Sequence, residues 1–329
     1  MQRFSKKLLA LLLVVFTIAA MAGCGKQNGS SDTDKSSGDK KYNIAMIANT
    51  TINDGGWNAA CYAAMLEAAE TYGFETTYTD EVAQTDYVST LTNYATMGYT
   101  AVFAPGTEFT DAVSEVAANF PDTTFILLNG DLQTDNIISI LADNYQLGEI
   151  AGCLAALQTQ TKHVALVGGI EISTADESVE GFKYAINKIN PDIDVSIIWA
   201  DTFDDAAKGK EIADSLVSTK DVDVIYGLAS VVDSGIRETL KDKENVWNIA
   251  QPSDMASTAP DIIVNSVCSS TGKMLSIALE MITKGEANAL ITGDVSNGCI
   301  FLGSYGDCAN DSVKENMDSY MQAISDKTF

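Results

Sequence analysis

Two aromatic residues stand where short apolar strands give way to helices, and a flat ring at such a place can bind a flat ligand. Trp57 follows a polar, glycine-rich loop over residues 52–56 and begins a helical pattern. Phe203 follows the apolar segment 194–199 and precedes another helical pattern. Aromatic faces stack well on planar rings, although either ring could instead pack in a core. One ring from each loop predicts a sandwich around a planar heterocycle.

The acids beside these rings have a simpler reading as well. Asn53 or Asp54 could cap the helix that begins at Trp57. Asp204 and Asp205 could be acids of a helix N-terminus.

The sequence offers little for catalysis. The chain has a single histidine, His163, which starts an apolar strand, so a serine–histidine–acid triad is implausible. It has no C-x-x-C pair, which argues against a zinc site. Gly168-Gly169 follows a strand, but no lysine of a phosphate-binding loop comes after it. We therefore expect no enzyme, no metal and no cofactor.

The elements that position the two rings alternate between short apolar strands and helices. The expected strands are 43–48, 75–79, 101–104, 124–128, 137–140, 163–167, 194–199, 222–226, 246–250 and 262–264. The expected helices are 57–73, 86–97, 111–120, 145–159, 178–189, 205–218, 233–241 and 273–284. This alternation is typical of parallel sheets covered by helices on both faces.

The pattern runs through two cycles and predicts an α/β fold of two lobes. We expect residues 42–158 plus about 267–287 in the N-terminal lobe. Residues 162–263 plus about 290–329 are expected in the C-terminal lobe. Ligands of parallel sheets bind beyond the carboxyl ends of the strands, which predicts a cleft between the lobes. Crossings near 264–269 and 288–292 would complete a hinge of several strands.

The N-terminus predicts export and a lipid anchor. Arg3, Lys6 and Lys7 precede an apolar run over residues 8–20 that is too short for a comfortable membrane span. Small residues then lead to Cys24, as in a bacterial lipobox, so residues 1–23 read as a lipoprotein signal peptide with Cys24 as the lipidation site. An ordinary signal peptide is the alternative. Residues 24–41 are polar and read as a flexible tether.

Charge and cysteines limit the partners further. The formal net charge of −25 argues against binding nucleic acid or anionic lipid headgroups, and it serves solubility.

Cys61, Cys153 and Cys268 lie in apolar contexts and read as buried. Cys299 and Cys308 flank a glycine-rich stretch and could pair outside the cell, although spacing alone does not fix a disulfide.

Four segments resemble the basic-membrane-lipoprotein family of solute-binding proteins, which includes purine nucleoside receptors of ABC importers. Residues 53–58 are similar to the family's Asp-x-Ser-Phe-Asn loop, and residues 148–152 to its Glu-x-Gly-Tyr-Leu-Ala-Gly helix. Residues 180–182 resemble its Gly-Phe element. Residues 202–210 closely match its Ser-Phe-x-Asp-Pro-Ala-Lys-Gly signature, the most specific of the four. The similarity runs from about Tyr42 to Lys284 and implies a type I periplasmic-binding-protein fold with the ligand cleft between its two lobes.

The resemblance implies roles for individual residues. Trp57 and Phe203 take the places of the two rings that clamp a base, while Asp54 and Asn58 take those of polar groups near its edge. Ser230 begins the segment that replaces the family's Gly-Gly-Thr-Gly loop.

The chain departs from the family at two positions that hold ribose. In the strand end over residues 250–254, Asp254 is kept but Pro252 replaces the other acid. Ser269 occupies the lysine slot of the Thr-Ser-x-x-Lys element. Both losses weigh against nucleoside recognition, while the aromatic clamp is retained.

By resemblance, the protein is a lipid-anchored substrate-binding protein on the extracytoplasmic face of a bacterial cell membrane. Its partners would be an ABC transporter permease, the membrane through the lipid on Cys24, and a small molecule such as a purine. A sugar- or flavin-binding receptor and a sensor feeding a membrane kinase are alternatives. A hydrolase working in the cleft would need a base and a nucleophile that the sequence does not clearly offer.

Overall fold

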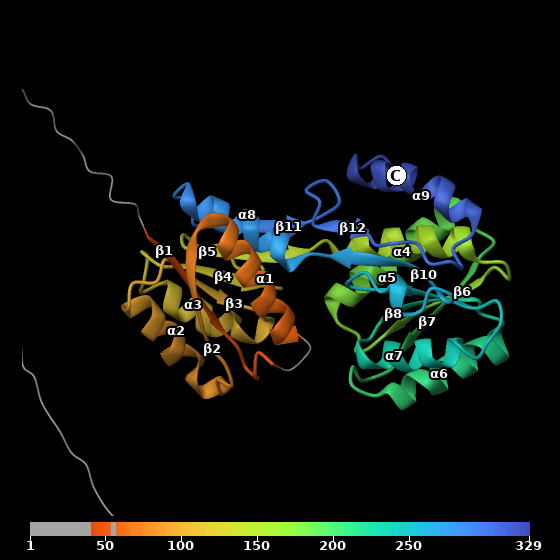
Figure 1. Cartoon of the computed structure of the whole chain (residues 1–329), viewed down its shortest axis with the longest axis horizontal. Helices are drawn as coiled ribbons and strands as arrows, with labels where there is room; N and C mark the ends of the chain where they lie inside the picture. Colours follow the sequence, from red (N-terminus) through yellow and green to blue (C-terminus); the bar gives the residue numbers. More distant parts are fainter. Residues whose placement is uncertain (1–40, 54–56) are drawn as a thin grey trace, which may run out of the picture. The chain divides into compact units, whose positions relative to one another are not determined.

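The computed structural model describes residues 41–53 and 57–329, and Cys24 and Asp54 lie outside that part of the chain. Two sheets of six strands organise it, both dominated by parallel pairing and both covered by helices. The α/β fold class expected from the sequence is therefore confirmed. Figure 1 shows the two sheets with their helices.

The first sheet has the strand order β11-β5-β4-β3-β1-β2 and is parallel throughout. Its strands are β1 (Tyr42–Ile47), β2 (Phe74–Thr79), β3 (Ala101–Ala104), β4 (Thr124–Leu128), β5 (Ile137–Ala142) and β11 (Ala289–Gly293). The helices α1 (Trp57–Tyr72) and α8 (Thr271–Thr283) pack together over one face, and α2 (Tyr87–Thr96) and α3 (Thr110–Ala117) over the other (Figure 1). Two short 3₁₀ turns, η1 (Gln84–Asp86) and η2 (Thr107–Phe109), precede α2 and α3.

The second sheet has the order β12-β10-β9-β8-β6-β7, in which only the β10–β12 pair is antiparallel. Its strands are β6 (His163–Gly168), β7 (Asp194–Trp199), β8 (Val224–Leu228), β9 (Trp247–Ala250), β10 (Ile263–Ser269) and β12 (Ile300–Leu302). One face carries α4 (Asn144–Gln158), α5 (Ser173–Ile189) and α9 (Asp311–Ser325). The other face carries α6 (Ala206–Lys220) and α7 (Val231–Leu240), and η3 (Ala256–Thr258) follows β9.

Alternating strand residues explain why both faces of each sheet are covered. In β1, Ile44 and Met46 face the core under α1 and α8, whereas Ala45 and Ile47 face the core under α2 and α3. All four are fully buried. A strand buried on both faces reads as a continuous apolar run, and such a run over residues 44–48 predicted β1.

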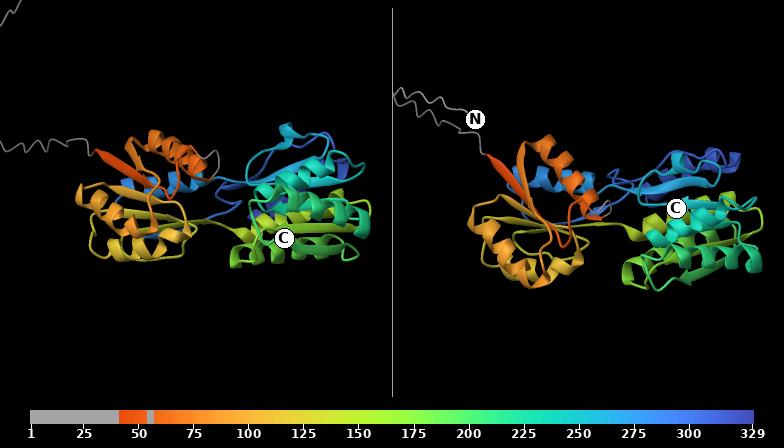
Figure 2. Two further views of the ribbon diagram at one scale, coloured as in Figure 1. Left: turned by 90° about the horizontal axis from the view of Figure 1, so that it is seen from below. Right: turned by 60° about the horizontal axis from the view of Figure 1, so that its bottom comes forward.

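The chain passes between the two sheets three times: from β5 into α4, from β10 into α8, and from β11 into β12. Backbone hydrogen bonds tie these crossings together, since the Asp143 N–H donates to Gly293 O over 2.8 Å and the Ser270 N–H to Cys299 O over 2.9 Å. Figure 2 shows the same segments from two further directions. Three linked crossings are the arrangement that a hinge of several strands requires.

The predicted lobe limits stay a prediction, and the packing of two elements bears on them. Helix α4 packs against α5 of the second sheet through Gly148 and Gly152, where any side chain would collide with the backbone of α5. The expected limits of the N-terminal lobe, residues 42–158, include this helix. Strand β11 pairs with β5 in the first sheet, although residues from about 290 onward were expected in the second lobe.

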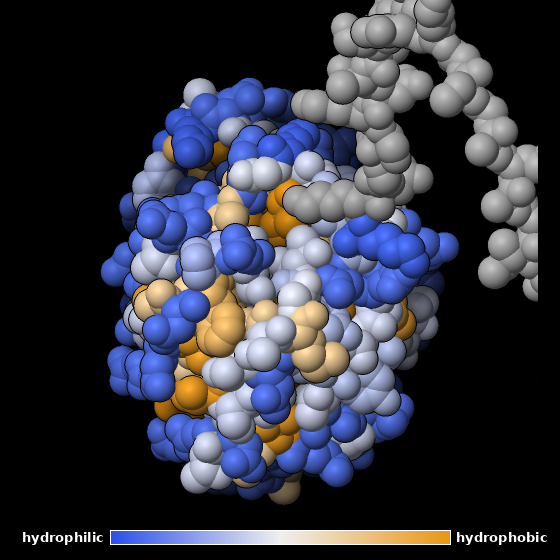
Figure 3. All heavy atoms as spheres, turned by 90° about the vertical axis from the view of Figure 1, so that its left-hand side faces the viewer, coloured by the Kyte–Doolittle hydropathy of each residue, from blue (hydrophilic) through white to orange (hydrophobic). Residues whose placement is uncertain are grey.

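The structure settles several smaller points. Among the described residues, no helix is both long enough and apolar enough to cross a membrane. The cysteines at 61, 153, 268, 299 and 308 are all free thiols, so the Cys299–Cys308 disulfide considered above is not formed. Figure 3 shows one face of the molecule, where apolar residues form separate patches among hydrophilic ones.

Candidate ligand-binding site

Trp57 is an exposed ring held in a fixed place. It is the first residue of α1 and is 47% exposed. Its indole Nε1–H donates to the carbonyl oxygen of Pro105 over 2.7 Å, and Pro105 directly follows β3. Trp57 therefore connects the ends of two neighbouring strands. It begins the helix that follows β1, and its hydrogen bond reaches the residue that follows β3. A half-exposed indole with its polar edge already paired has a free face for stacking.

Asn58 organises the loop in front of this ring. The side chain is 3% exposed, and its Nδ2 group donates to Asn49 Oδ1 over 3.1 Å and to the hydroxyl of Thr50. Asn49 in turn donates to Glu108 Oε1 over 2.9 Å. The chain of amides and carboxylate links the ends of β1 and β3, so these contacts make Asn58 a positioning residue.

Phe203 lies over the loop that follows β6. Its ring sits so close to Gly169 that a Cβ atom at that position would collide with it. Phe203 is half-buried, and its backbone carbonyl oxygen accepts a hydrogen bond from the Val231 N–H over 2.9 Å. Three strand ends of the second sheet, those of β6, β7 and β8, therefore meet at Phe203. Asp205 is occupied elsewhere, because it caps α6 by accepting from the Lys208 N–H over 3.0 Å.

Ser230 sits at a sharp turn between β8 and α7. It is exposed and has a φ of 53°, a left-handed conformation that is uncommon for serine. Asp233 stabilises this turn: its side chain is 4% exposed and accepts a hydrogen bond from the Ala229 N–H over 3.0 Å. Burial raises the pKa of the Asp233 carboxyl to about 7, although this backbone donor and Arg237 act in the opposite direction. The second oxygen, Oδ1, has no hydrogen-bond partner among the described residues.

Asp254 is exposed, but its carboxylate is engaged. Oδ2 accepts from the Ser304 hydroxyl over 2.7 Å and from the Ser304 N–H over 2.9 Å, while Oδ1 accepts from the Ala256 N–H over 3.2 Å. The Ser304 hydroxyl and then its N–H lower the pKa of Asp254. The residue thus fastens the loop after β9 to the segment after β12, and turning toward a ligand would break these bonds.

Ser269 ends β10 beside the loop that follows β9. Its N–H donates to the carbonyl oxygen of Pro252 over 2.9 Å. The two positions at which the chain departs from the ribose-holding pattern are therefore direct neighbours. Neither brings a charge to this place, and Ser269 offers a half-buried hydroxyl.

The predicted site residues thus fall into three groups. Trp57 and Asn58 lie at the strand ends of the first sheet, with Asp54 outside the described residues. Phe203 and Ser230 lie together at the strand ends of the second sheet, joined through Val231. Asp254 and Ser269 lie where β10 leads into a crossing. The described residues contain no cluster of three or more histidines, cysteines and acids that could hold a metal.

A family model described as "ABC transporter substrate-binding protein PnrA-like" matches residues 41–328. The chain belongs to this family. The match covers both sheets and all three crossings, so the resemblance found in the sequence is confirmed.

Named relatives of this PnrA-like protein are similar over most of its length. An ABC transporter nucleoside-binding protein, BmpA of Lactococcus lactis, is 27% identical over 76% of this chain and 74% of its own. A purine-binding protein of Brucella abortus is 25% identical over 71% and 67%. Among solved structures, a transcriptional activator of the comK gene from Bacillus halodurans has a TM-score of 0.76 at 20% identity over 85% of this chain and 96% of that one. An Aeropyrum pernix ABC transporter solute-binding protein reaches 0.72 at 16% identity over 87% and 92%.

Sequence reasoning missed several residues that build the candidate site. Asn49, Glu108 and Thr50 follow strands of the first sheet and support Trp57 through Asn58. Their position just after β1 and β3 was the available signal, because ligand sites of parallel sheets lie at these ends. Gly169 was considered above only as part of a phosphate-binding loop, yet it makes room for the Phe203 ring.

Proposed function

We propose that this PnrA-like protein is an extracytoplasmic, lipid-anchored receptor that binds a planar heterocycle and delivers it to an ABC importer. The ligand ring lies between Trp57 of the first sheet and Phe203 of the second, and the three crossings bend to close the lobes on it. The observation that carries the proposal is the exposed indole of Trp57, fixed by Pro105 at a strand end. The names of the relatives from Lactococcus lactis and Brucella abortus support a purine-type ligand.

The surroundings of Ser269 favour a free base over a nucleoside. A ribose is best held by charge-assisted bonds from a carboxylate and an ammonium group. Here Pro252 and Ser269 supply neither, and Asp254 is bound to Ser304. Each ribose hydroxyl left unpaired on burial costs about 1–3 kcal/mol. A nucleobase avoids this cost because it carries no ribose.

Native mass spectrometry of the purified protein, followed by calorimetry, tests the proposal. Adenine is compared with adenosine, and guanine with guanosine. We expect at least one base to bind more tightly than its nucleoside. If every nucleoside bound tenfold more tightly than its base, the preference for a free base would be refuted. If no purine bound and the copurified ligand were not a planar ring, the receptor proposal for heterocycles would fail.

A further inference from the structure

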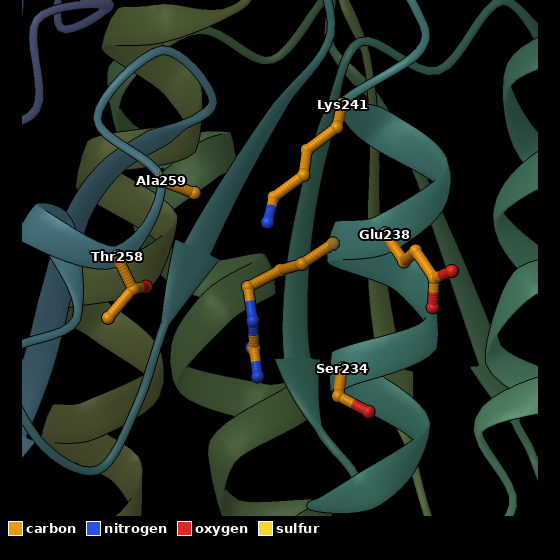
Figure 4. A pocket seen from close by; sticks show the side chains of 6 residues that line it. Ser234, Glu238, Lys241, Thr258 and Ala259 are labelled. Atoms are coloured by element: carbon orange, nitrogen blue, oxygen red, sulfur yellow. The ribbon is translucent and has the colours of Figure 1, made fainter.

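A pocket lies on the face of the second sheet that carries α6 and α7. It has a volume of about 330 Å³ and lies between α7 and the segment around η3. Its lining residues are Ser234, Arg237, Glu238, Lys241, Thr258 and Ala259. Figure 4 shows the pocket from close by.

Arg237 and Lys241 stand one helical turn apart on α7 and its C-terminal end, so their side chains share one face. In Figure 4, Lys241 reaches toward the side of the pocket formed by Thr258 and Ala259, and the Glu238 carboxylate points the opposite way. Glu238 is also neutralised, since Lys210 Nζ lies 2.8 Å from its Oε1. The pocket therefore presents two cations without a free acid from its own lining.

Neither cation has an ion-pair partner or a side-chain hydrogen bond among the described residues. The chain carries 45 acids against 20 lysines and arginines, so a missing partner is not due to a shortage of acids. Lysines elsewhere use these acids, for example Lys243 with Asp214 over 2.9 Å. A partly buried guanidinium without a direct partner favours an anion from outside.

Asp233 is the acid that acts on Arg237 from within the protein. It stands four residues earlier on α7, but its Oδ2 accepts from Ala229 and no ion pair within 4 Å joins it to Arg237. Burial lowers the pKa of the Arg237 guanidinium, and the charge of Asp233 raises it. An arginine remains protonated at physiological pH despite such shifts. Its charge toward the pocket thus persists.

We propose that this pocket is a binding site for a phosphate-type oxyanion. The planar guanidinium of Arg237 holds two of its oxygens, and the Lys241 ammonium holds a third. The hydroxyls of Thr258 and Ser234 already donate to the carbonyls of Met255 and Val231, so recognition rests on the two cations. The ligand is either free phosphate or a phosphate ester on a larger molecule.

The overall negative charge of the protein opposes the two cations, but salt limits its reach. The Debye length is about 8 Å at physiological ionic strength. Arg237 and Lys241 therefore act on an anion in the pocket more strongly than distant acids do. We therefore expect a dissociation constant of about 1 mM that rises with ionic strength. At 10 mM phosphate this corresponds to a melting temperature about 3 °C higher.

Thermal unfolding of the full chain in phosphate and in chloride of equal ionic strength tests the site. The variants are Lys241→Gln and Arg237→Gln, with Lys183→Gln as the matched control. Lys183 is an exposed lysine on α5, on the opposite face of the sheet from α7. Its replacement by glutamine changes the net charge by the same amount as each pocket substitution. Wild type and Lys183→Gln should gain about 3 °C in phosphate, and both pocket variants should lose most of that gain. Calorimetry should give at least tenfold weaker phosphate binding to Lys241→Gln.

Lys241→Gln keeps the test decisive even if Arg237→Gln fails to fold, because Lys241 is exposed. Glycerol 3-phosphate distinguishes the two sources: tighter binding than inorganic phosphate indicates an ester, and weaker binding indicates the free ion. Equal effects of phosphate and chloride on the wild type would overturn the proposal. So would a phosphate effect that survives in Lys241→Gln.

Discussion

Replacing Trp57 by alanine tests the proposed clamp most directly. Stacking of a ring on an aromatic side chain contributes about 1–3 kcal/mol. Trp57→Ala should therefore weaken ligand binding by roughly 5- to 150-fold. Trp57→Phe keeps a ring but loses the N–H bond to Pro105, which contributes about 0.5–1.5 kcal/mol, so binding should weaken only about 2- to 10-fold.

The cost in stability follows from the exposure of the ring. With 47% of Trp57 exposed, about half of its ~200 Å² is buried, which corresponds to roughly 2.5 kcal/mol. The bond to Pro105 adds about 1 kcal/mol. A domain of ordinary stability, about 5–15 kcal/mol, remains folded after such a loss. The binding effect can therefore be measured on folded protein.

Isothermal titration calorimetry with the copurified ligand gives the affinities, and circular dichroism confirms folding. Leu66→Ala is the matched control, because Leu66 lies on the same helix and is 39% exposed. It should leave affinity unchanged. If Trp57→Ala bound its ligand within twofold of the wild type, or melted while the residual folded protein bound normally, the ring would be part of the packing and not of the clamp.

Three further predictions concern other parts of the molecule. Gly169→Ala should displace the Phe203 ring and weaken ligand binding about tenfold by calorimetry, as much as Phe203→Ala does; normal affinity would place the ring outside the site. Burial raises the pKa of Asp233 and of Glu149 to about 7, so the folded state binds more protons than the unfolded one between about pH 4 and 7. The free energy of unfolding should fall across this range as pH rises, and urea titrations should find a shallower fall for Asp233→Asn; an unchanged slope would contradict this. Cys24→Ala should abolish acyl labelling and membrane partition without changing the melting temperature, and retained partition would place the anchor elsewhere.

Local sequence patterns predicted the buried strands well. β3, β4 and β7 have the limits expected from the sequence; β3 and β4 are short, fully buried strands, and β7 is a partly buried edge strand. Helix α5 begins at Ser173, five residues before its expected start, since its first turns are polar and exposed. Residues 288–292 were expected only as a hinge crossing and contain most of β11, whereas β12 and helix α9 were not predicted. β11 is defined by pairing with β5, about 150 residues earlier, which no local pattern encodes.

For the candidate site, the sequence indicated single residues and not the contacts between them. Trp57 and Phe203 stand out because rare residue types occupy strand-to-helix turns. What their polar neighbours do depends on partners distant in sequence: Asp254 is held by Ser304, and Ser269 meets Pro252. These pairings follow from the packing of β9, β10 and β12, so the sequence alone does not reveal that these residues contact one another.

The three crossings also constrain the order in which the chain can fold. The first sheet is complete only when β11 has paired with β5, and its core also needs α8. Both elements are synthesised after almost the whole second sheet. Such distant pairings slow folding. An N-terminal fragment ending before residue 271 would lack an edge strand and one covering helix of its sheet, so early chain segments should stay loosely packed. For a chain that is exported as proposed above, slow folding leaves time to cross the membrane before the fold is complete.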